Sequence, residues 1–310
     1  MRSAAERNRC NRETQMKNVG VIGLGDMGSG LAKNLIEAGF TVRGCDLSEK
    51  RIAAFQALGG EPLPSAADVG ARSDAVFVMV MTGDQAKAVI LGDGLAATMK
   101  PGGVVLLTAT IKASEAREIG AALDGTGIEL IDSPVSGGFP GAQTGTLTMM
   151  AAGSDTALAQ VRPVMEAVSK NIHRVGAEVG MGQTVKACLQ SLIGSIFTAT
   201  CEASALAAKA GVKGQVLYDV FSTSGAGCGV ANTALSNIID RQFVGTGSHI
   251  STMYKDLTIA MDMARDLGVP LFTAATAMQL FQAGKTKHPE ADNWVVARVM
   301  EDIVGAELAR

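Results

Sequence analysis

The sequence has few cysteines, and none of them lies in a C-x-x-C pair. This spacing excludes the usual zinc knuckle, and an odd total of five argues against a framework of paired disulfides. We therefore expect no metal site and a reducing compartment, the cytoplasm. The five positions are Cys10, Cys45, Cys188, Cys201 and Cys228.

Excess charge of one sign and long apolar runs are also missing. The 27 basic and 30 acidic residues give a net charge of -3 without a basic stripe, so neither nucleic acid nor anionic lipid is an expected partner. No run approaches the roughly 18 uninterrupted apolar residues of a spanning helix, and no apolar segment follows the charges at the N-terminus. We expect a protein that is neither secreted nor bound to a membrane.

Apolar runs alternate with helical stretches through the first half of the chain. Strand, helix and strand in this order are typical of a parallel sheet covered on both faces. We predict an α/β fold, a Rossmann-type doubly wound parallel sheet of six to eight strands, over residues 17–180, after a flexible polar tail over residues 1–16. The expected strands cover residues 19–22, 41–45, 75–80, 103–107, 128–131, 146–152 and 172–175, with a helix at 28–38.

The pattern becomes purely helical after that. Residues 183–210 contain small and aliphatic side chains without proline, which predicts one long helix. An all-α C-terminal domain is therefore expected over residues 181–310. The apolar flank of the long helix favours pairing with another subunit, as a homodimer or homotetramer. Further helices are predicted at 216–221, 233–240, 253–267, 271–283 and 294–308.

A glycine-rich turn follows the first predicted strand directly. It reads G-x-G-x-x-G and opens a helix, which is the arrangement that receives a dinucleotide pyrophosphate on free helix N–H groups. The alternative, three glycines in an ordinary turn, is weak in this context. The expected cofactor-binding residues are Gly23, Leu24, Gly25, Asp26, Met27 and Gly28.

Polar residues follow the ends of three further strands. Asp46, eighteen positions after Gly28, is placed to bind the adenosine ribose and to repel a 2′-phosphate, which favours NAD over NADP. Its alternative role is to cap the next helix, a role that Ser48 also suits. Met81 and Thr110 come just after two later strands, at the edge where ligands bind. Alternation points Arg43 away from the Asp46 carboxylate.

Four motifs in this order resemble the β-hydroxyacid dehydrogenase family. They are GLGDMG at 23–28, DSPVSGG at 132–138, G-x-G-x-x-x-K at 180–186 and KDL at 255–257. The resemblance spans residues 18–305 and is greatest to the L-threonate dehydrogenase-like members. A 3-hydroxyisobutyrate dehydrogenase and a 3-hydroxy amino acid dehydrogenase are also open. It implies NAD-dependent oxidation of a small hydroxy acid.

Oxidation of a hydroxyl group by hydride transfer from its carbon to a nicotinamide requires a base that takes the hydroxyl proton, and Lys186 is our candidate. A lysine that begins a helix near a domain boundary is partly desolvated and faces the cationic nicotinamide, and both effects favour the uncharged amine. The resemblance adds that Ser136, Gly137 and Gly138 contact the substrate. Backbone N–H groups and a hydroxyl there suit its carboxylate.

The resemblance also suggests residues beyond Lys186. Gln190, four residues later, shares its helix face and is expected to bind substrate. Leu189 departs from the family, which commonly has asparagine or histidine at this position, and this puts a substrate copied from 3-hydroxyisobutyrate dehydrogenase in doubt. Lys255 is assigned to the cofactor and Asp256 to substrate binding and support. By sequence alone the pair is an exposed dipeptide on a helix.

Two other classes of function share this architecture. A non-catalytic dinucleotide-binding relative lacks the lysine, and an imine reductase usually replaces it with an acidic group. The identity of residue 186 therefore discriminates among the three, and Lys186 favours the dehydrogenase.

Overall fold

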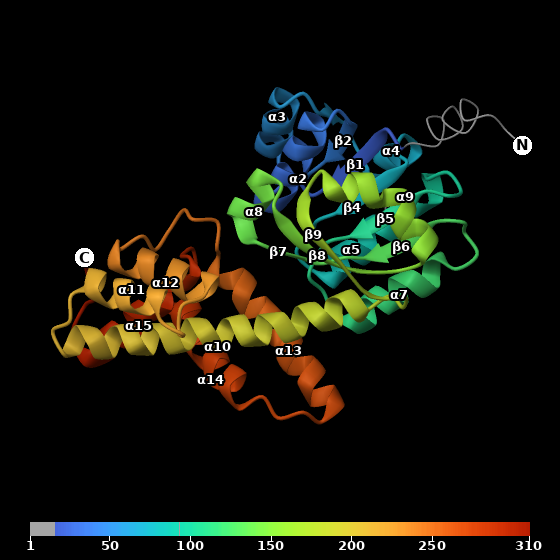
Figure 1. Cartoon of the computed structure of the whole chain (residues 1–310). Helices are drawn as coiled ribbons and strands as arrows, with labels where there is room; N and C mark the ends of the chain where they lie inside the picture. The colour runs from blue at the N-terminus through green and yellow to red at the C-terminus, as the bar shows by residue number, and fades with distance from the viewer. Residues whose placement is uncertain (1–15, 93) are drawn as a thin grey trace, which may run out of the picture. The chain divides into compact units, whose positions relative to one another are not determined.

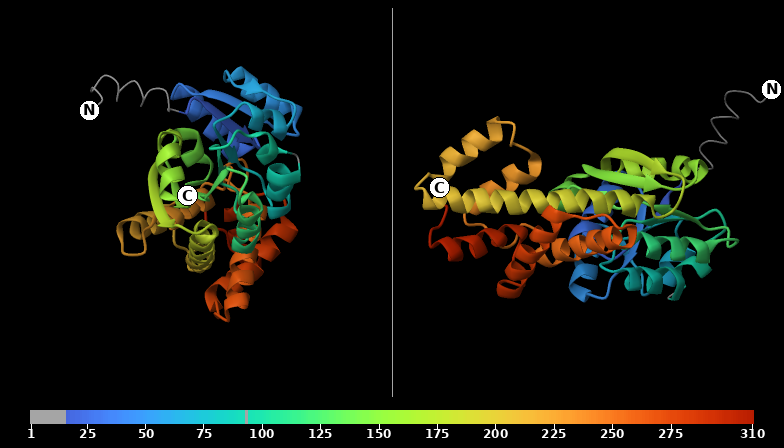
Figure 2. Two further views of the ribbon diagram at one scale, coloured as in Figure 1. Left: turned by 90° about the vertical axis from the view of Figure 1, so that its right-hand side faces the viewer. Right: turned by 90° about the horizontal axis from the view of Figure 1, so that it is seen from below.

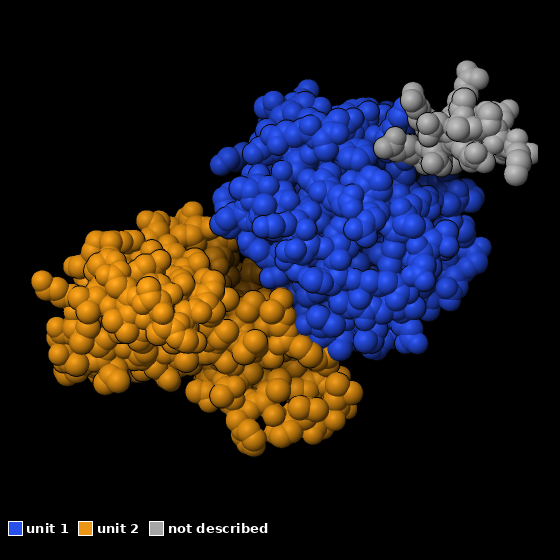
Figure 3. Space-filling model, viewed as in Figure 1, with its two compact units in different colours: residues 1–186 blue, residues 187–310 orange. Residues whose placement is uncertain are grey.

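The computed structural model describes residues 16–92 and 94–310, which form two compact units, residues 1–186 and 187–310 (Figure 3). The unit boundary follows Lys186 and lies inside a helix, a few residues after the expected boundary at 180. The expected tail, except for Met16, lies outside the described residues. Met16 is buried in the core of the first unit.

The first unit is built on a nine-stranded sheet within the described residues, in the order β3-β2-β1-β4-β5-β6-β8-β7, with β9 paired to β8. The first six strands in this order are all parallel, and the chain changes direction across the sheet between β1 and β4. Ligands bind at such a switch point in open α/β sheets. The strands are β1 (Asn18–Ile22), β2 (Thr41–Cys45), β3 (Glu61–Pro62), β4 (Ala75–Val78), β5 (Val104–Leu107), β6 (Glu129–Asp132), β7 (Val135–Ser136), β8 (Leu147–Ala152) and β9 (Ser169–Gly176).

Helices cover both faces of this sheet (Figure 1). Side chains alternate along the central strands, so that Phe77 belongs to one core cluster while its neighbours Val76 and Val78 belong to the other. Each face of the sheet thus has a buried core cluster, which confirms the doubly wound fold. The helices are α2 (Asp26–Glu37), α3 (Glu49–Ala57), α4 (Ala66–Ala71), α5 (Gly83–Lys87), the π-helical η1 (Ala88–Gly92), α6 (Leu95–Thr98), α7 (Ala113–Leu123), α8 (Gly138–Thr144) and α9 (Asp155–Glu166).

The sheet differs from the expectation in its last part. The predicted six to eight strands become nine because β3 and β7 have two residues each, too few for a period to show. Strand β8 runs antiparallel to β6 and β7, while β9 is parallel to β8. The purely parallel sheet is therefore wrong for this part, although the parallel strands dominate. Nothing local distinguishes the direction of a short buried strand.

The second unit is helical, as predicted. Phe197 packs edge-on against Phe281 and Trp294, with ring centroids 6.1 and 5.6 Å apart, at the centre of its core. Helix α10 contributes to both units and runs without a break (Figure 2). The helices are α10 (Met181–Lys209), α11 (Gly214–Thr223), α12 (Gly229–Ile239), α13 (Ile250–Leu267), α14 (Phe272–Lys287), the 3₁₀ turn η2 (Asn293–Val295) and α15 (Val296–Val304).

Helix α10 is also long and apolar enough to cross a membrane by length and composition, with a mean hydropathy of 1.3. It has 44% of its most apolar window buried inside the structure, and polar residues interrupt it. A core helix of a soluble protein satisfies the same test. Length and composition therefore do not assign this helix to a membrane.

Candidate functional site

At the first and last positions of the glycine-rich turn after β1, no residue other than glycine fits. Gly23 has a φ of +86°, and its N–H donates to the Cys45 carbonyl at 3.1 Å. A Cβ on Gly28 would lie 1.8 Å from the Gly23 carbonyl oxygen, closer than any real contact. At Gly25 the nearest atom to such a Cβ is the Arg51 guanidinium carbon, 3.6 Å away, so a side chain would make only an ordinary contact there. The turn thus offers the cradle that a pyrophosphate requires.

The other residues of the turn take different positions. Leu24 has its side chain in the core, and its N–H donates to Asp46 Oδ2 at 2.7 Å, so it shapes the turn through its backbone. Asp26 is exposed in the first turn of α2, where an acidic side chain suits the helix dipole. Met27 is half-buried and packs against the core. Their contacts with a cofactor stay predictions.

Asp46 connects this turn to the next helix. Its two carboxylate oxygens accept from the backbone N–H groups of Leu24 and Ser48, at 2.7 and 2.8 Å. Ser48 is the N-cap residue of α3, and its side chain makes no capping hydrogen bond. Arg43 ion-pairs with Glu61 at 2.8 Å, away from Asp46. The ribose role of Asp46 stays a prediction.

Met81 and Thr110 lie where the sequence places them, after the ends of β4 and β5. These strands are parallel neighbours beside β1, so both residues lie at the same sheet edge as the glycine-rich turn. Met81 is exposed, and its N–H donates to Gln85 Oε1 at 2.8 Å. Thr110 is half-buried. Topology thus brings together residues that lie far apart in the sequence.

Lys186 lies in the first unit, beside the loop formed by Ser136, Gly137 and Gly138 (the Ser136 loop). Lys186 is 6% exposed, and its Nζ donates to the Val135 carbonyl at 2.8 Å, next to Ser136 in β7. Gly137 and Gly138 follow at φ values of +127° and +59°, which disfavour any residue with a side chain. Helix α8 begins at Gly138, so the N–H of this residue has no intrahelical acceptor. A buried amine therefore lies beside a loop with backbone donors.

The start of helix α10 is held by a buried carboxylate that the sequence did not identify. Asp132, at the end of β6, has no exposed surface. Its Oδ2 accepts from the N–H groups of Gly180 and Gln183 at 2.8 and 3.2 Å, and its Oδ1 accepts from Gln183 Nε2 at 2.9 Å. These bonds fix the first turn of the helix that carries Lys186.

The same glutamine also holds the loop after β5. Gln183 Nε2 donates to the Ala109 carbonyl, and Gln183 Oε1 accepts from the Ile111 N–H, each at 3.0 Å. The two bonds lie on either side of Thr110, a predicted cofactor residue. Through these hydrogen bonds, Gln183 connects the loop that contains Thr110 to the first turn of α10, the helix that carries Lys186. The sequence shows only a glutamine three residues before Lys186, without a signal for its partners.

The buried carboxyl gives the stability of this unit a pH dependence. Burial raises the pKa of Asp132 above its ordinary 3.8, while the hydrogen bonds from Gln183 and Gly180 act in the opposite direction. The folded state then binds the proton more tightly than the unfolded state, so this group makes the free energy of unfolding fall as the pH rises from 3.8 toward the raised pKa.

We predict that Asp132→Asn removes this fall in urea unfolding curves measured from about pH 4 to pH 7, because an amide does not titrate there. The variant should also be less stable by about 1–3 kcal/mol, because the side-chain NH₂ of asparagine cannot accept the hydrogen bonds that one carboxyl oxygen accepts. Asp155→Asn, which changes an exposed aspartate paired with Arg174, is the matched control and should leave the slope unchanged. A wild-type stability that rises relative to Asp132→Asn over this range contradicts the prediction.

A second polar cluster lies in the helical unit. Gln190 Nε2 donates to Asp256 Oδ2 at 2.6 Å, and Lys255 Nζ lies 2.9 Å from Asp256 Oδ1. Asp256 is 4% exposed, so the interpretation of this pair as an exposed dipeptide is wrong for the aspartate. Burial of a carboxylate between an amide and an ammonium group is stable only when both partners stay in place. Asp256 thus orients Gln190 and Lys255, whose ligands stay predictions.

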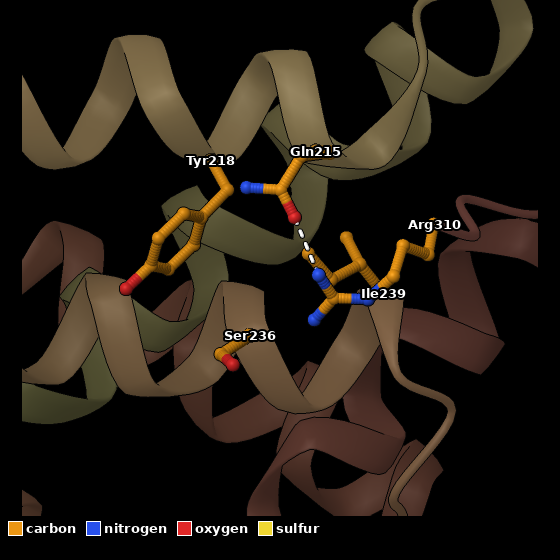
Figure 4. A pocket seen from close by; sticks show the side chains of 5 residues that line it. All are labelled: Gln215, Tyr218, Ser236, Ile239 and Arg310. Atoms are coloured by element: carbon orange, nitrogen blue, oxygen red, sulfur yellow. Dashed lines mark hydrogen bonds between the residues drawn. The ribbon is translucent and has the colours of Figure 1, made fainter.

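The helical unit also contains a small pocket between α11, α12 and the C-terminal residue (Figure 4). Arg310 donates to Gln215 Oε1 at 2.5 Å and pairs with Asp240 at 2.6 Å. None of the residues predicted for the site lines this pocket. Across residues 16–92 and 94–310, no group of three or more His, Cys, Asp or Glu side chains is placed to hold a metal ion.

Two protein-family models match the chain. One, described as the NAD binding domain of 6-phosphogluconate dehydrogenase, matches residues 18–176. The other, described as NAD-binding of NADP-dependent 3-hydroxyisobutyrate dehydrogenase, matches residues 180–300. Together they cover the sheet unit and most of the helical unit.

Individual proteins agree with these models. The chain is 36% identical to an L-threonate dehydrogenase of Escherichia coli O6:H1, over 92% of this chain and 95% of that protein. It is 36% identical to an NAD-dependent L-serine dehydrogenase of Pseudomonas aeruginosa, over 82% and 84%. The crystal structure of a 3-hydroxyisobutyrate dehydrogenase from Salmonella typhimurium superposes with a TM-score of 0.84 at 34% identity, over 91% of this chain and 99% of that one.

Proposed function

Because the chain belongs to the β-hydroxyacid dehydrogenase family related to 3-hydroxyisobutyrate dehydrogenase, we propose that it oxidises a small sugar acid of the L-threonate type. The relatives are named as dehydrogenases of L-threonate, L-serine and 3-hydroxyisobutyrate, and the L-serine dehydrogenase is described as NAD-dependent. The sugar acid is the finer assignment, and the identity to L-threonate dehydrogenases over nearly the whole chain supports it.

The observation that carries the mechanism is the buried Lys186 amine beside the Ser136 loop. In this mechanism the turn from Gly23 to Gly28 holds the pyrophosphate, and the bound cofactor supplies the hydride acceptor. Gly138 and Ser136 donate hydrogen bonds to the substrate carboxylate, which orients the hydroxyl group. Lys186 then takes the hydroxyl proton as the carbonyl forms, while its bond to Val135 holds the amine in place.

Two alternative functions differ from this one at residue 186. A non-catalytic nucleotide-binding relative needs no base, and an imine reductase usually has an acidic group in its place. Lys186 is buried, and its amine donates a hydrogen bond to Val135 in the strand before the Ser136 loop. This position supports a dehydrogenase rather than a non-catalytic relative or an imine reductase. Leu189 lacks the polar group common in the family, so selectivity for a sugar acid must come from other residues.

The function is tested by measuring NADH formation by the purified protein with four acids, namely L-threonate, 3-hydroxyisobutyrate, glycerate and serine. Each acid is offered with NAD and with NADP. We expect the highest kcat/KM for L-threonate with NAD. A higher kcat/KM for another acid contradicts the sugar-acid assignment alone, whereas NAD binding without turnover of any acid favours the non-catalytic alternative.

We also propose that the protein is a cytoplasmic homo-oligomer, a dimer or tetramer, with no nucleic-acid or membrane partner. Support for the oligomer comes from α10, where Cys188, Leu192, Ala199 and Leu206 recur at helical spacing on one exposed face. Leu192 and Leu206, which are 58% and 73% exposed, lie on this face, and a second subunit would cover them. Light scattering gives the native mass.

A further inference from the structure

Helix α8 follows the Ser136 loop directly and packs against α2, the helix that begins in the glycine-rich turn (Figure 1). The Gly141 N–H donates to the Gly137 carbonyl at 3.1 Å, so α8 is hydrogen-bonded to the loop. A Cβ on Gly30 would lie 2.6 Å from the carbonyl group of Ala142, so the backbones of α2 and α8 approach each other closely. The loop proposed for the substrate and the turn proposed for the cofactor are therefore joined through two helices of the first unit.

Asn34 of α2 connects the two helices through its side-chain amide. Its Nδ2 donates to the Gly30 carbonyl, one turn earlier in α2, at 2.7 Å, and to the Ala142 carbonyl of α8 at 2.8 Å. The last carbonyl groups of a helix have no intrahelical donor, and Asn34 supplies one from outside α8. Both N–H groups of this amide are thus used, one on each helix, so the amide fixes the spacing of the two backbones.

Gln143 of α8 makes the reciprocal connection to α2. Its Nε2 donates to the Asp26 carbonyl, inside the glycine-rich turn, at 3.2 Å, and lies 3.4 Å from Ser29 Oγ. In the opposite direction, Lys33 Nζ donates to the Gln143 carbonyl at 3.3 Å. Side chains of each helix therefore bind the backbone of the other, and one of these bonds reaches the turn itself.

The proposed oxidation depends on the distance between these two parts of the first unit. The glycine-rich turn sets the position of the cofactor, and the Ser136 loop sets the position of the substrate carboxylate. Hydride transfer requires the reacting atoms to be about 3–3.5 Å apart, and a displacement of about 1 Å can lower the rate about a hundredfold. Bonds that hold α8 against α2 therefore affect the reaction without touching either ligand.

We propose that Asn34 and Gln143 are positioning residues for this oxidation. They hold the Ser136 loop at a fixed distance from the glycine-rich turn, so that the substrate carboxylate and the cofactor are bound in register. Neither side chain contacts substrate or cofactor in this proposal. The inference rests on the proposed function, because it takes the turn as the cofactor site and the loop as the carboxylate site.

The first test is Asn34→Ala, assayed with whichever of the four acids the wild type oxidises with the highest kcat/KM. We expect KM for the acid to rise about fivefold and kcat to fall about tenfold, within the loss that a displacement of about 1 Å can cause. The dissociation constant of NADH should change by less than about threefold, because the turn keeps its bond to β2. Asn237→Ala is the matched control: it removes a bond to the Thr233 carbonyl of 2.8 Å, one turn earlier within α12, and should change none of these constants.

Gln143→Glu tests the second connection with a smaller change. Glutamate has nearly the volume of glutamine, but its carboxylate cannot donate to the Asp26 carbonyl, so we expect KM to rise about threefold. Gln160→Glu is its control, because Gln160 Nε2 of α9 donates to the Gly102 carbonyl at 2.9 Å on the surface of the same unit. It should leave KM unaltered.

The change in KM separates positioning from a purely structural role. A purely structural role would lower the folded fraction, and with it kcat, while KM stays at the wild-type value. An unchanged KM in a folded variant of either residue therefore overturns the inference alone, as does an equal rise of KM in a control variant. A wild type that binds NADH but oxidises none of the four acids overturns the proposed function and the inference with it.

Discussion

Replacing Lys186 by alanine is expected to lower kcat for hydroxy-acid oxidation by about a thousandfold, since a positioned general base contributes roughly 10²- to 10⁴-fold. The buried amine is the group that takes the hydroxyl proton in the proposed mechanism, and alanine leaves no group of suitable basicity beside Val135. The affinity for NADH should stay close to the wild-type value. The measurement is steady-state NADH formation together with a nucleotide titration of the same preparation.

Lys209→Ala is the control for this experiment. Lys209 lies on the same helix and donates from Nζ to the Val304 carbonyl at 2.7 Å, so the same chemical change is made at an exposed lysine in the other unit. It should leave kcat unaltered. Retention of most of the activity in Lys186→Ala would rule out Lys186 as the base, and loss of NADH binding together with activity would indicate a structural role instead.

Replacing Gly28 by alanine is expected to destabilise the first unit by about 3 kcal/mol or more and to abolish nucleotide binding. The added Cβ would lie 1.8 Å from the Gly23 carbonyl oxygen and 2.9 Å from the carbon, so helix α2 and strand β1 must separate. Both atoms are backbone and cannot rotate away. Thermal unfolding and NADH titration measure the two effects.

Gly25→Ala separates folding from binding. The atom nearest to its Cβ would be the Arg51 guanidinium carbon at 3.6 Å, an ordinary contact with the end of a flexible side chain. We expect the melting temperature to stay near wild type while NADH affinity falls at least about tenfold, because the methyl group takes the space of the pyrophosphate. A Gly25→Ala variant that binds NADH normally would place the pyrophosphate elsewhere.

The fold was largely predictable because its signals are local. Seven strands and the long helix were expected within a few residues of their bounds, since buried parallel strands appear as continuous apolar runs and helices as 3.6-residue periods. The misses are β3 and β7, too short to show a period, and the antiparallel direction of β8. Strand direction depends on distant partners, and a local pattern does not contain it.

Among the predicted site residues, the glycines stand where a backbone requirement selects one residue type. Glycines at 23, 28, 137 and 138 stand where a Cβ would collide or where φ is positive. Because the backbone requires glycine there, the sequence motif marks these positions. The sequence did not predict that Asp132 and Gln183 are partners, because fifty-one positions separate them. Neither residue by itself indicates a buried hydrogen bond. Buried polar networks are recognised by their partners, and those come from the fold.

The sequence by itself determined the α/β and all-helical halves, the glycine-rich turn, the lysine at 186 and the family, since each depends on residues close together in the chain. Tertiary structure alone decided that the Lys186 amine is buried against Val135, that Asp132 and Gln183 hold its helix, and that Asn34 and Gln143 join α2 to α8. The physical reason is that burial and hydrogen-bond partners arise only when distant segments pack together. Burial and hydrogen-bond partners together determine the protonation state of each charged group and the hydrogen bonds that it can offer to a ligand.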